Sequence, residues 1–556
     1  MTAIAINRVH ARYRLASGTD GQAQRLQRIL AEVLDSGLEA AVQRSGIDTS
    51  GELCIREVNA LARLNLGEAD PALAAKLALA IADAIEAGVE KRGADLVRYG
   101  SRAHALIDLA VAAIGGDFTR AWAWRRLAIW SAESPLPRVD AVRLVLRALT
   151  AEPRHATAAV AELANNPVLF DRFLSDASPP QLVALARAVV EAAGCNAAVL
   201  VPPAERPTMP YASVASERAH QLLRRSAIAR AGAASRSTEW TADSRRHALA
   251  ALIVSDAEPA LLRAPTDRVR ELIDAVAAEL IELVGTPDAA AREWSRARTQ
   301  LQGGRHEPDS TSASEPPPGS GSEPGSASAE RRDSRSQARA RSSGPARTHS
   351  SPSMQASQSA SPPRPPGLRD TAESSASSPE PSMQPLPEVR RRAHTRLGGL
   401  LYLVNVANRI GVAERIVQER RLAERSPRWG LHQLALALVA VTASDPAALA
   451  FAGLLPESDP PDRDQPPASE AELCAIAELR GELVRALRDV LDRPLDADAA
   501  LIDFVCRRTA EIVADPGWLE VRLSLDDART EIRAAGLDLD PGWVPWLGVV
   551  IKFVYA

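Results

Sequence analysis

A long low-complexity segment, residues 302–392, divides this chain and sets the first limit on its fold. Serine, proline, glycine, alanine and arginine dominate the segment, and it contains no aromatic residue. Such a segment cannot bury enough apolar surface to offset the entropy lost on ordering. We therefore expect it to be disordered, so that it tethers the two flanking halves without packing them together.

The same segment holds an arginine cluster from Arg331 to Arg347 and a proline run from Pro362 to Pro366. A disordered basic cluster can bind nucleic acid or an acidic partner, and a proline run can be a polyproline ligand. Glu330 and Asp333 dilute the positive charge, however, and no aromatic residue lies between the arginines. The composition favours a solvated linker, and we do not expect nucleic-acid binding.

The first region, residues 1–92, predicts a small β-α-β-α unit. Residues 8–15 alternate like a strand, with one apolar and one basic face. These faces carry Val9, Ala11, Tyr13 and Leu15, and Arg8, His10, Arg12 and Arg14. An apolar stripe from Leu26 to Val42 predicts a helix, residues 53–66 alternate as a second strand, and Asp70-Pro71 signals another helix start. We interpret the basic face as solvated or partner-facing; an anion site is the second interpretation.

The second region, residues 93–301, predicts helices throughout. Apolar periodicity and proline or glycine breaks delimit helices at 104–114, 119–130, 137–151, 155–164, 179–193, 213–231, 241–254 and 266–284. No shared motif recurs at a fixed period, so a solenoid has no support from the sequence. Trp122, Trp124 and Trp130 fall on one predicted helix, where we expect them to pack in the core.

The fourth region, residues 393–556, predicts a helical domain that ends in β-structure. Helices are expected from Leu397 to Val412, Ala413 to Leu422, Trp429 to Thr442 and Ala471 to Leu491. Strand alternation follows at 519–525 and again at 549–555. An Asp-Pro-Gly-Trp sequence precedes each of these strands. The pair therefore predicts a two-stranded ribbon, which would need to pack on the helices or on another subunit's sheet.

The C-terminal seventeen residues are the candidate docking element. Asp540, Pro541 and Gly542 are typical of a tight turn, in which the aspartate can cap its own backbone. Trp518, Trp543 and Trp546 flank the turns and are expected to clamp the ribbon onto the helical layer. A platform for a saccharide or nucleotide is the second interpretation. The full candidate set is Asp540, Pro541, Gly542, Trp543, Pro545, Trp546, Val549, Ile551, Phe553 and Tyr555.

The composition points to no enzyme chemistry that we can identify. The sequence has no phosphate-binding Walker loop, no GxSxG elbow, no HExxH helix and no EF-hand loop. The four cysteines are far apart, and the net charge of −4 gives no attraction to nucleic acid or anionic membranes. We expect a non-enzymatic protein with no catalytic, cofactor or metal site. We also expect no signal peptide or membrane span, and hence a soluble protein that is cytoplasmic when made.

The C-terminal sequence resembles that of the tape-measure proteins of extracellular contractile injection systems, which are phage-tail-like bacterial particles. The resemblance rests on Arg533, Gly536 to Asp538, Asp540 to Trp543, Pro545, Leu547 and Gly548, and on the aromatic strand that follows. Two further segments are similar to the family: 400–412, which opens the C-terminal helices, and the first region, with Leu66-Gly67 near the end of its second strand.

The resemblance implies a structural or assembly component of such a particle, acting in tube-length control or baseplate assembly. Its partners would be tube, baseplate or cap proteins. The sequence departs from a ruler, however, because its helices are short and broken by proline and it lacks long heptad repeats. A second hypothesis is a helical adaptor that organises cytoplasmic partners through its disordered linker.

Overall fold

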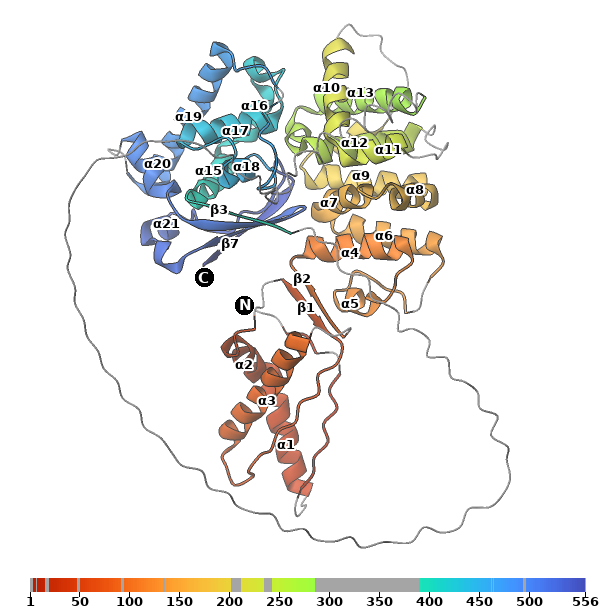
Figure 1. Ribbon diagram of the computed structural model, residues 1–556, viewed down its shortest axis with the longest axis vertical. Coiled ribbons are helices and arrows are strands. Elements are labelled where there is room, and N and C mark those ends of the chain that lie inside the picture. The colour runs from red at the N-terminus through yellow and green to blue at the C-terminus, as the bar shows by residue number, and fades with distance from the viewer. Residues whose placement is uncertain are drawn as a thin grey trace, which may run out of the picture. The chain divides into compact units, whose positions relative to one another are not determined.

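The protein is mainly helical, as the sequence predicts, with a small mixed unit near its N-terminus and a β-sheet near its C-terminus (Figure 1). The computed structural model describes residues 4–6, 8–15, 20–47, 51–91, 95–133, 136–201, 212–234, 243–285, 390–461, 463, 465–493 and 497–555. Residues 302–389 of the predicted disordered segment lie outside the described residues. Its last three residues are described, and Arg391 and Arg392 belong to a strand of the C-terminal sheet.

The N-terminal unit has the element order α-β-α-β rather than β-α-β-α. Its elements are α1 (Asp20–Glu32), the π-helical turn η1 (Val33–Gly37), α2 (Leu38–Arg44), β1 (Glu52–Ile55), α3 (Asp70–Lys91) and β2 (Leu96–Tyr99). The predicted first strand, residues 8–15, is irregular, and the second is confined to Glu52–Ile55. Strand β1 pairs antiparallel with β2, which the sequence did not predict. The strand-like alternation at 8–15 thus has no partner strand among the described residues, and a strand forms only beside one.

Arg25 ties the start of α3 to α1. Its Nε donates to Asp70 Oδ1 at 2.7 Å, and its terminal nitrogens donate to the carbonyls of Leu66 and Glu68 at 2.8 and 2.6 Å. A small core of its own lies between the helices of this unit, formed by Ile29, Val33, Leu38, Ala41, Val42, Leu73, Ala78 and Ala82.

The second region consists of helices (Figure 1), several of which pack most closely on a helix two or more elements away in the sequence. They are α4 (Arg102–Gly115), α5 (Ala121–Arg126), α6 (Arg138–Ala151), α7 (Pro153–Ala164), α8 (Pro167–Asp176), α9 (Pro179–Ala192), η2 (Ala197–Leu200), α10 (Ala212–Arg225), α11 (Ala227–Ala234), α12 (Asp243–Ala257), η4 (Pro259–Arg263) and α13 (Thr266–Gly285).

Two predicted helices of this region are shorter than expected. The helix expected at 119–130 ends at Arg126, and Ala128 follows with a φ of 56°. The helix expected at 213–231 is broken at Ser226, whose hydroxyl donates to Asp256 at 2.7 Å and accepts from the Ala229 amide. Ser226 thus caps α11, which is the usual role of serine at a helix start.

The C-terminal domain places helices beside a five-stranded mixed sheet (Figure 1). The helices are η5 (Gly398–Tyr402), α15 (Leu403–Ile410), α16 (Val412–Gln418), η6 (Arg420–Leu422), α17 (Pro427–Leu438), α18 (Pro446–Phe451), α19 (Glu470–Leu491), α20 (Asp498–Cys506), η7 (Leu525–Asp527) and α21 (Thr530–Ala534). The strands are β3 (Arg391–Thr395), β4 (Ala510–Asp515), β5 (Trp518–Leu523), β6 (Gly542–Val544) and β7 (Val549–Tyr555).

The prediction of a two-stranded ribbon is therefore wrong, because the described sheet has five strands. The strand order is β3-β4-β5-β7-β6, in which β5 and β7 run parallel and the other neighbours antiparallel. The two predicted strands do pair, with Val521 beside Phe553. Asp515-Pro516-Gly517-Trp518 is the turn between β4 and β5, so it does not merely introduce one strand. Its Gly517 has a φ of 74°, a conformation that glycine adopts without a steric cost.

The helical region and the C-terminal domain pack together, a point that the sequence left open. Their described residues belong to one compact unit and share one apolar core. Arg263 Nε donates to Glu414 Oε1 at 2.7 Å, and Arg218 donates to the Arg425 carbonyl at 3.0 Å. The buried apolar side chains of both regions, not the linker, hold the halves together.

A buried ion pair fixes the proline-rich loop before α19. Arg425 Nε donates to Glu472 Oε1 at 2.6 Å, and its terminal nitrogens reach the carbonyls of Pro466 and Pro467 at 2.9 and 3.0 Å. Hydrogen bonds from Arg425 hold the pKa of Glu472 down at about 2, although burial acts in the opposite direction. The backbone N–H and hydroxyl of Ser469 also donate to this carboxylate.

We expect this carboxylate to contribute a pH-dependent part of the stability. Because the pKa of Glu472 is depressed from 4.5 to about 2 on folding, its contribution is present above pH 4.5 and is lost as the pH falls towards 2. The Glu472→Gln variant should lack this component. Urea unfolding of both proteins across this range measures the difference, and parallel pH profiles would contradict the expectation.

Candidate functional site

The first Asp-Pro-Gly-Trp turn lies where the sheet meets the helical region. Asp515 is fully buried, and both of its carboxylate oxygens accept from Arg390, at 3.0 and 2.9 Å. The Arg390 guanidinium occupies the space that a Cβ atom at Gly100 would fill, so the loop before α4 needs a glycine there. The ring of Trp518 lies 6.5 Å from that of His155 in α7. These contacts join the turn to the helical region.

The second Asp-Pro-Gly-Trp sequence, residues 540–543, lies at the start of the hairpin that β6 and β7 form. Asp540 does not cap its own backbone as expected; its Oδ1 accepts from the backbone N–H of Phe553 at 2.7 Å. Pro541 precedes β6, and Gly542 opens this strand with a φ of 66°. Pro545 lies in the turn that returns the chain into β7. The carboxylate of Asp540 thus fixes the β6–β7 hairpin from outside the turn.

Trp543 and Trp546, the two tryptophans of the C-terminal seventeen residues, contact helices of two different regions. Trp543 Nε1 donates to the carbonyl of Ala192, at the end of α9, at 3.2 Å. Trp546 is buried and its Nε1 donates to Asn408 Oδ1 in α15. Trp543 therefore contacts the helical region and Trp546 the C-terminal helices, which is the clamping position expected from the sequence.

Burial in the terminal strand alternates only at its centre, where Lys552 is exposed between two buried residues. Ile551 and Phe553 are buried, whereas Val549 and Tyr555 are partly buried. Phe553 packs edge to face on Tyr402 with ring centroids 4.9 Å apart.

The end of this strand carries a short hydroxyl chain. The hydroxyls of Tyr402 and Tyr555 lie 2.6 Å apart, and Tyr555 donates to Asp538 at 3.2 Å. Burial is the largest cause that raises the pKa of Tyr402, and the hydrogen bond with Tyr555 is the second. Burial also raises the pKa of Tyr555. Both phenols are consequently neutral donors at physiological pH.

The candidate docking residues thus make contacts within the chain. Strand β7 pairs with β5 on one side, whereas on the other side β6 pairs with Val549 to Ile551 only, and the N–H of Phe553 beyond them donates to Asp540. The structure brings together Asp540 and Phe553 directly, and it places Trp543, Trp546 and Tyr555 on three different neighbours. Together these contacts hold the C-terminal sheet against the helical region and against the C-terminal helices.

The N-terminal unit presents a different surface, formed by the irregular segments 8–15 and 57–65. Neither segment belongs to a strand of either sheet, and Figure 1 shows both as irregular chain. Val9, Tyr13, Val58 and Leu61 are exposed, and Leu61 has an exposed fraction of 87%. The basic residues between Arg8 and Arg14 are exposed as well. We refer to these two segments as the unpaired segments.

Among the residues that the structure describes, no group of three or more histidine, cysteine or acidic side chains is placed to hold a metal ion. None of the described helices has both the length and the apolar character required to cross a membrane. Burial raises the pKa of the Cys54 thiol to about 11 and that of Cys506 to about 12, which keeps both protonated.

The fold thus defines a class: a mainly helical protein whose C-terminal mixed sheet is clamped to its helices. Comparison with protein-family models, with curated proteins and with solved structures gives no match.

Proposed function

We propose that this chain is a non-enzymatic assembly component of an extracellular contractile injection system, which acts on the tube or baseplate and is made in the cytoplasm. The resemblance of its C-terminal sequence to tape-measure proteins supplies the family. The observation that supports an assembly role is the exposure of the unpaired segments, whose strand-like sequence has no partner strand among the described residues. Partner-facing apolar side chains are typical of proteins that complete their structure in an assembly.

The unpaired segments are suited to adding a strand to another protein's sheet. Strand addition uses the backbone for affinity and alternate side chains for specificity. In residues 8–15, Val9 and Tyr13 would enter the apolar side of that sheet, and the basic residues would point to the other side. The expected partner therefore has an open sheet edge with acidic residues on one face.

The helix lengths favour a folded assembly factor over an extended ruler. The longest described helices, α3 and α19, have 22 residues each, which corresponds to about 33 Å at 1.5 Å per residue. Such helices do not run along a tube. We infer that the chain acts as a folded body on the tube or baseplate.

Replacing Leu61 by aspartate in a host that makes the particles tests this proposal. Leu61 is exposed, so the free protein should stay folded, but the charge would be buried in the assembled complex at a large cost. We expect fewer particles, or particles of altered length, by electron microscopy. The control is Val168→Asp on α8, where the valine is 61% exposed. Normal particles from the Leu61 variant would refute the assembly role of this surface.

The adaptor hypothesis depends on the linker, residues 302–389, which lies outside the described residues. It predicts that the linker alone captures the partners of the full chain. Loss of all partners on replacement of the linker by a glycine-serine chain of equal length would favour the adaptor over the assembly factor.

A further inference from the structure

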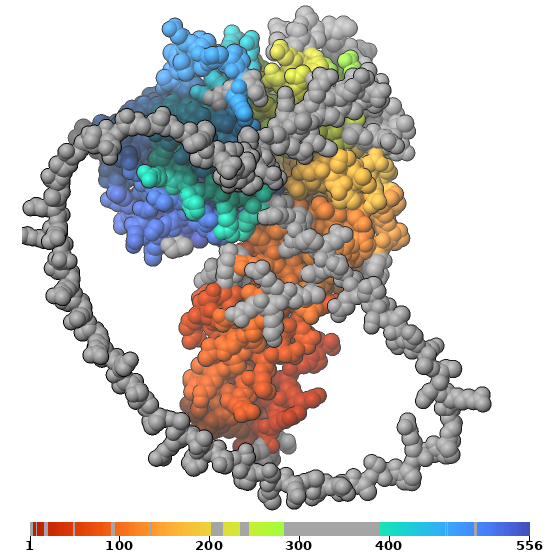
Figure 2. Space-filling model, viewed as in Figure 1, coloured from red at the N-terminus to blue at the C-terminus, as the bar shows by residue number. Residues whose placement is uncertain are grey.

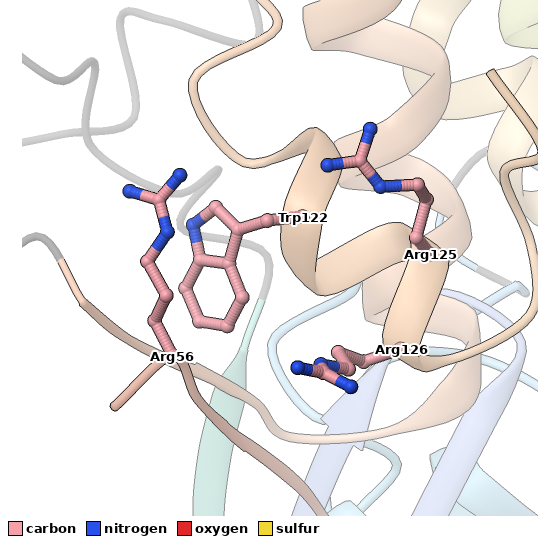
Figure 3. Close-up of a pocket in the computed structure, with 4 residues that line it drawn as sticks. All are labelled: Arg56, Trp122, Arg125 and Arg126. Atoms are coloured by element: carbon pink, nitrogen blue, oxygen red, sulfur yellow. The ribbon is translucent and has the colours of Figure 1, made fainter. Parts of the chain in front are cut away.

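A positively charged pocket lies between the end of β1 and the short helix α5. Its volume is about 420 Å³, and its lining residues are Arg56, Trp122, Arg125 and Arg126. Figure 3 shows Arg56 beside the indole of Trp122, with Arg125 and Arg126 extending from the same helix as the tryptophan. This volume is within the range of small-molecule sites. None of the four lining residues carries a negative charge.

A buried polar cluster holds α5, and hence the pocket wall, in place. Asp108 is fully buried and accepts from the Tyr99 hydroxyl and from Trp124 Nε1, both at 2.8 Å. Arg120, the residue before α5, donates to the two oxygens of Asp108 at 2.7 and 3.0 Å. Because these bonds flank Trp122 in the sequence, the lining residues extend from a fixed backbone.

The pocket has hydrogen-bond donors that the described residues do not use. Trp122 is 7% exposed, and its buried Nε1 has no acceptor within the described chain. A buried indole N–H normally finds a partner. Arg126 has no hydrogen-bond or ion-pair partner among the described residues. Arg125 donates through one nitrogen only, to the carbonyls of Ala132 and Glu133, and this fixes its side chain.

The fourth lining residue, Arg56, is only weakly engaged. It lies 3.5 Å from Asp95, and both side chains are more than half exposed. Its guanidinium is also 5.8 Å from the centre of the Trp122 ring. An exposed pair of this kind contributes little, so Arg56 can turn to a stronger anion.

We propose that this pocket binds a phosphate-bearing small molecule. Guanidinium groups match phosphate oxygens with paired hydrogen bonds, and three of them call for more than one negative charge. The Nε1–H of Trp122 would donate to the same anion and so gain the acceptor that it lacks within the chain. A phosphate dianion fits this donor set better than a single carboxylate. The assignment is independent of the proposed assembly function.

Calorimetric titration of the full-length protein with sodium pyrophosphate at low ionic strength tests the site. Arg126→Ala should weaken binding by at least about tenfold, because a hydrogen bond to a charged group is lost. Trp122→Phe should weaken it by about tenfold, since the ring stays and only the N–H is removed. The matched control is Arg187→Ala, an exposed arginine on α9, which should bind as the unaltered protein does.

The competing results are distinct. Absence of pyrophosphate binding up to about 10 mM would overturn the proposal, as would equal losses in the Arg126 and Arg187 variants. Citrate that binds as tightly as pyrophosphate would overturn the assignment to phosphate. Far-UV circular dichroism checks that each variant is folded, and Arg126→Gln replaces Arg126→Ala if the alanine variant is not.

Discussion

Asp108→Ala is expected to destabilise the protein by about 3–5 kcal/mol, because it leaves a buried guanidinium without its carboxylate. Asp108 is 0% and Arg120 3% exposed. The Tyr99 hydroxyl and Trp124 Nε1 would lose their acceptor at the same time. In the unaltered protein, burial and then the charge of Asp108 raise the pKa of Tyr99, so this phenol is a neutral donor to Asp108. The shift of the urea unfolding transition, followed by circular dichroism, measures the effect.

Asp140→Ala is the matched control. Asp140 accepts from Arg143 at 3.1 Å on the surface of α6, where both side chains are largely exposed. Surface ion pairs of this kind contribute about 0–1 kcal/mol. Similar losses in the two variants would show that the Asp108 cluster is solvated, and this would also remove the rigid support assigned to the pocket wall.

Phe553→Ala is expected to cost about 3–5 kcal/mol, the usual range for a buried phenylalanine. Phe553 is 8% exposed, pairs with Val521 of β5 and packs on Tyr402. Lys552→Ala, at the exposed neighbouring position of the same strand, should leave the stability nearly unchanged. The unfolding midpoints of the two variants provide the measurement. A small effect at Phe553 would indicate that β7 is not part of the core.

This placement changes how a C-terminal truncation should be interpreted. Removal of residues 540–556 would delete β6, β7 and the Trp543 contact with Ala192. The edge of β5 that pairs with β7 would then be exposed, together with apolar side chains of the core. Loss of particles after such a truncation would therefore report unfolding, and substitutions at exposed positions are needed to report docking.

The sequence was informative where local signals dominate. Proline at the first helical position and apolar periodicity located most helices of the second region, because these signals act within one turn of the helix. Helix α8 was missed, although Asn166, Pro167 and the spacing of Phe170 and Phe173 form a legible start signal. Both strands predicted after Asp-Pro-Gly-Trp exist, but the first ends at Leu523 and not at Leu525, and the short β6 precedes the second.

The sequence was uninformative where contacts join distant segments. Strand β3 lies next to the low-complexity segment, and its pairing with β4 spans more than a hundred residues. Nothing local in Arg391–Thr395 indicates a strand, because its partner supplies the hydrogen bonds. The shared core of the two halves was likewise hidden, since the composition of the linker says nothing about the surfaces that it connects.

The sequence identified the residues of the candidate site but not the residues that they contact. The turn residues and tryptophans of the C-terminal sequence were identified, but their partners, Ala192 and Asn408, lie on helices that no motif marks. Trp122 was assigned to the core with Trp124 and Trp130. All three do lie in the core, Trp124 and Trp130 with ring centroids 6.0 Å apart, and Trp122 lines the pocket as well. The adjacent Arg125-Arg126 pair was the available signal for that second role.

Hydrogen exchange of residues 8–15 and 57–65, measured by mass spectrometry in the free protein and in purified particles or their assembly intermediates, tests the assembly role most directly. The proposal predicts fast exchange of these amides in the free chain, where no sheet partner protects them, and slow exchange in the complex. Fast exchange in both states, with the chain present in the complex, would contradict it.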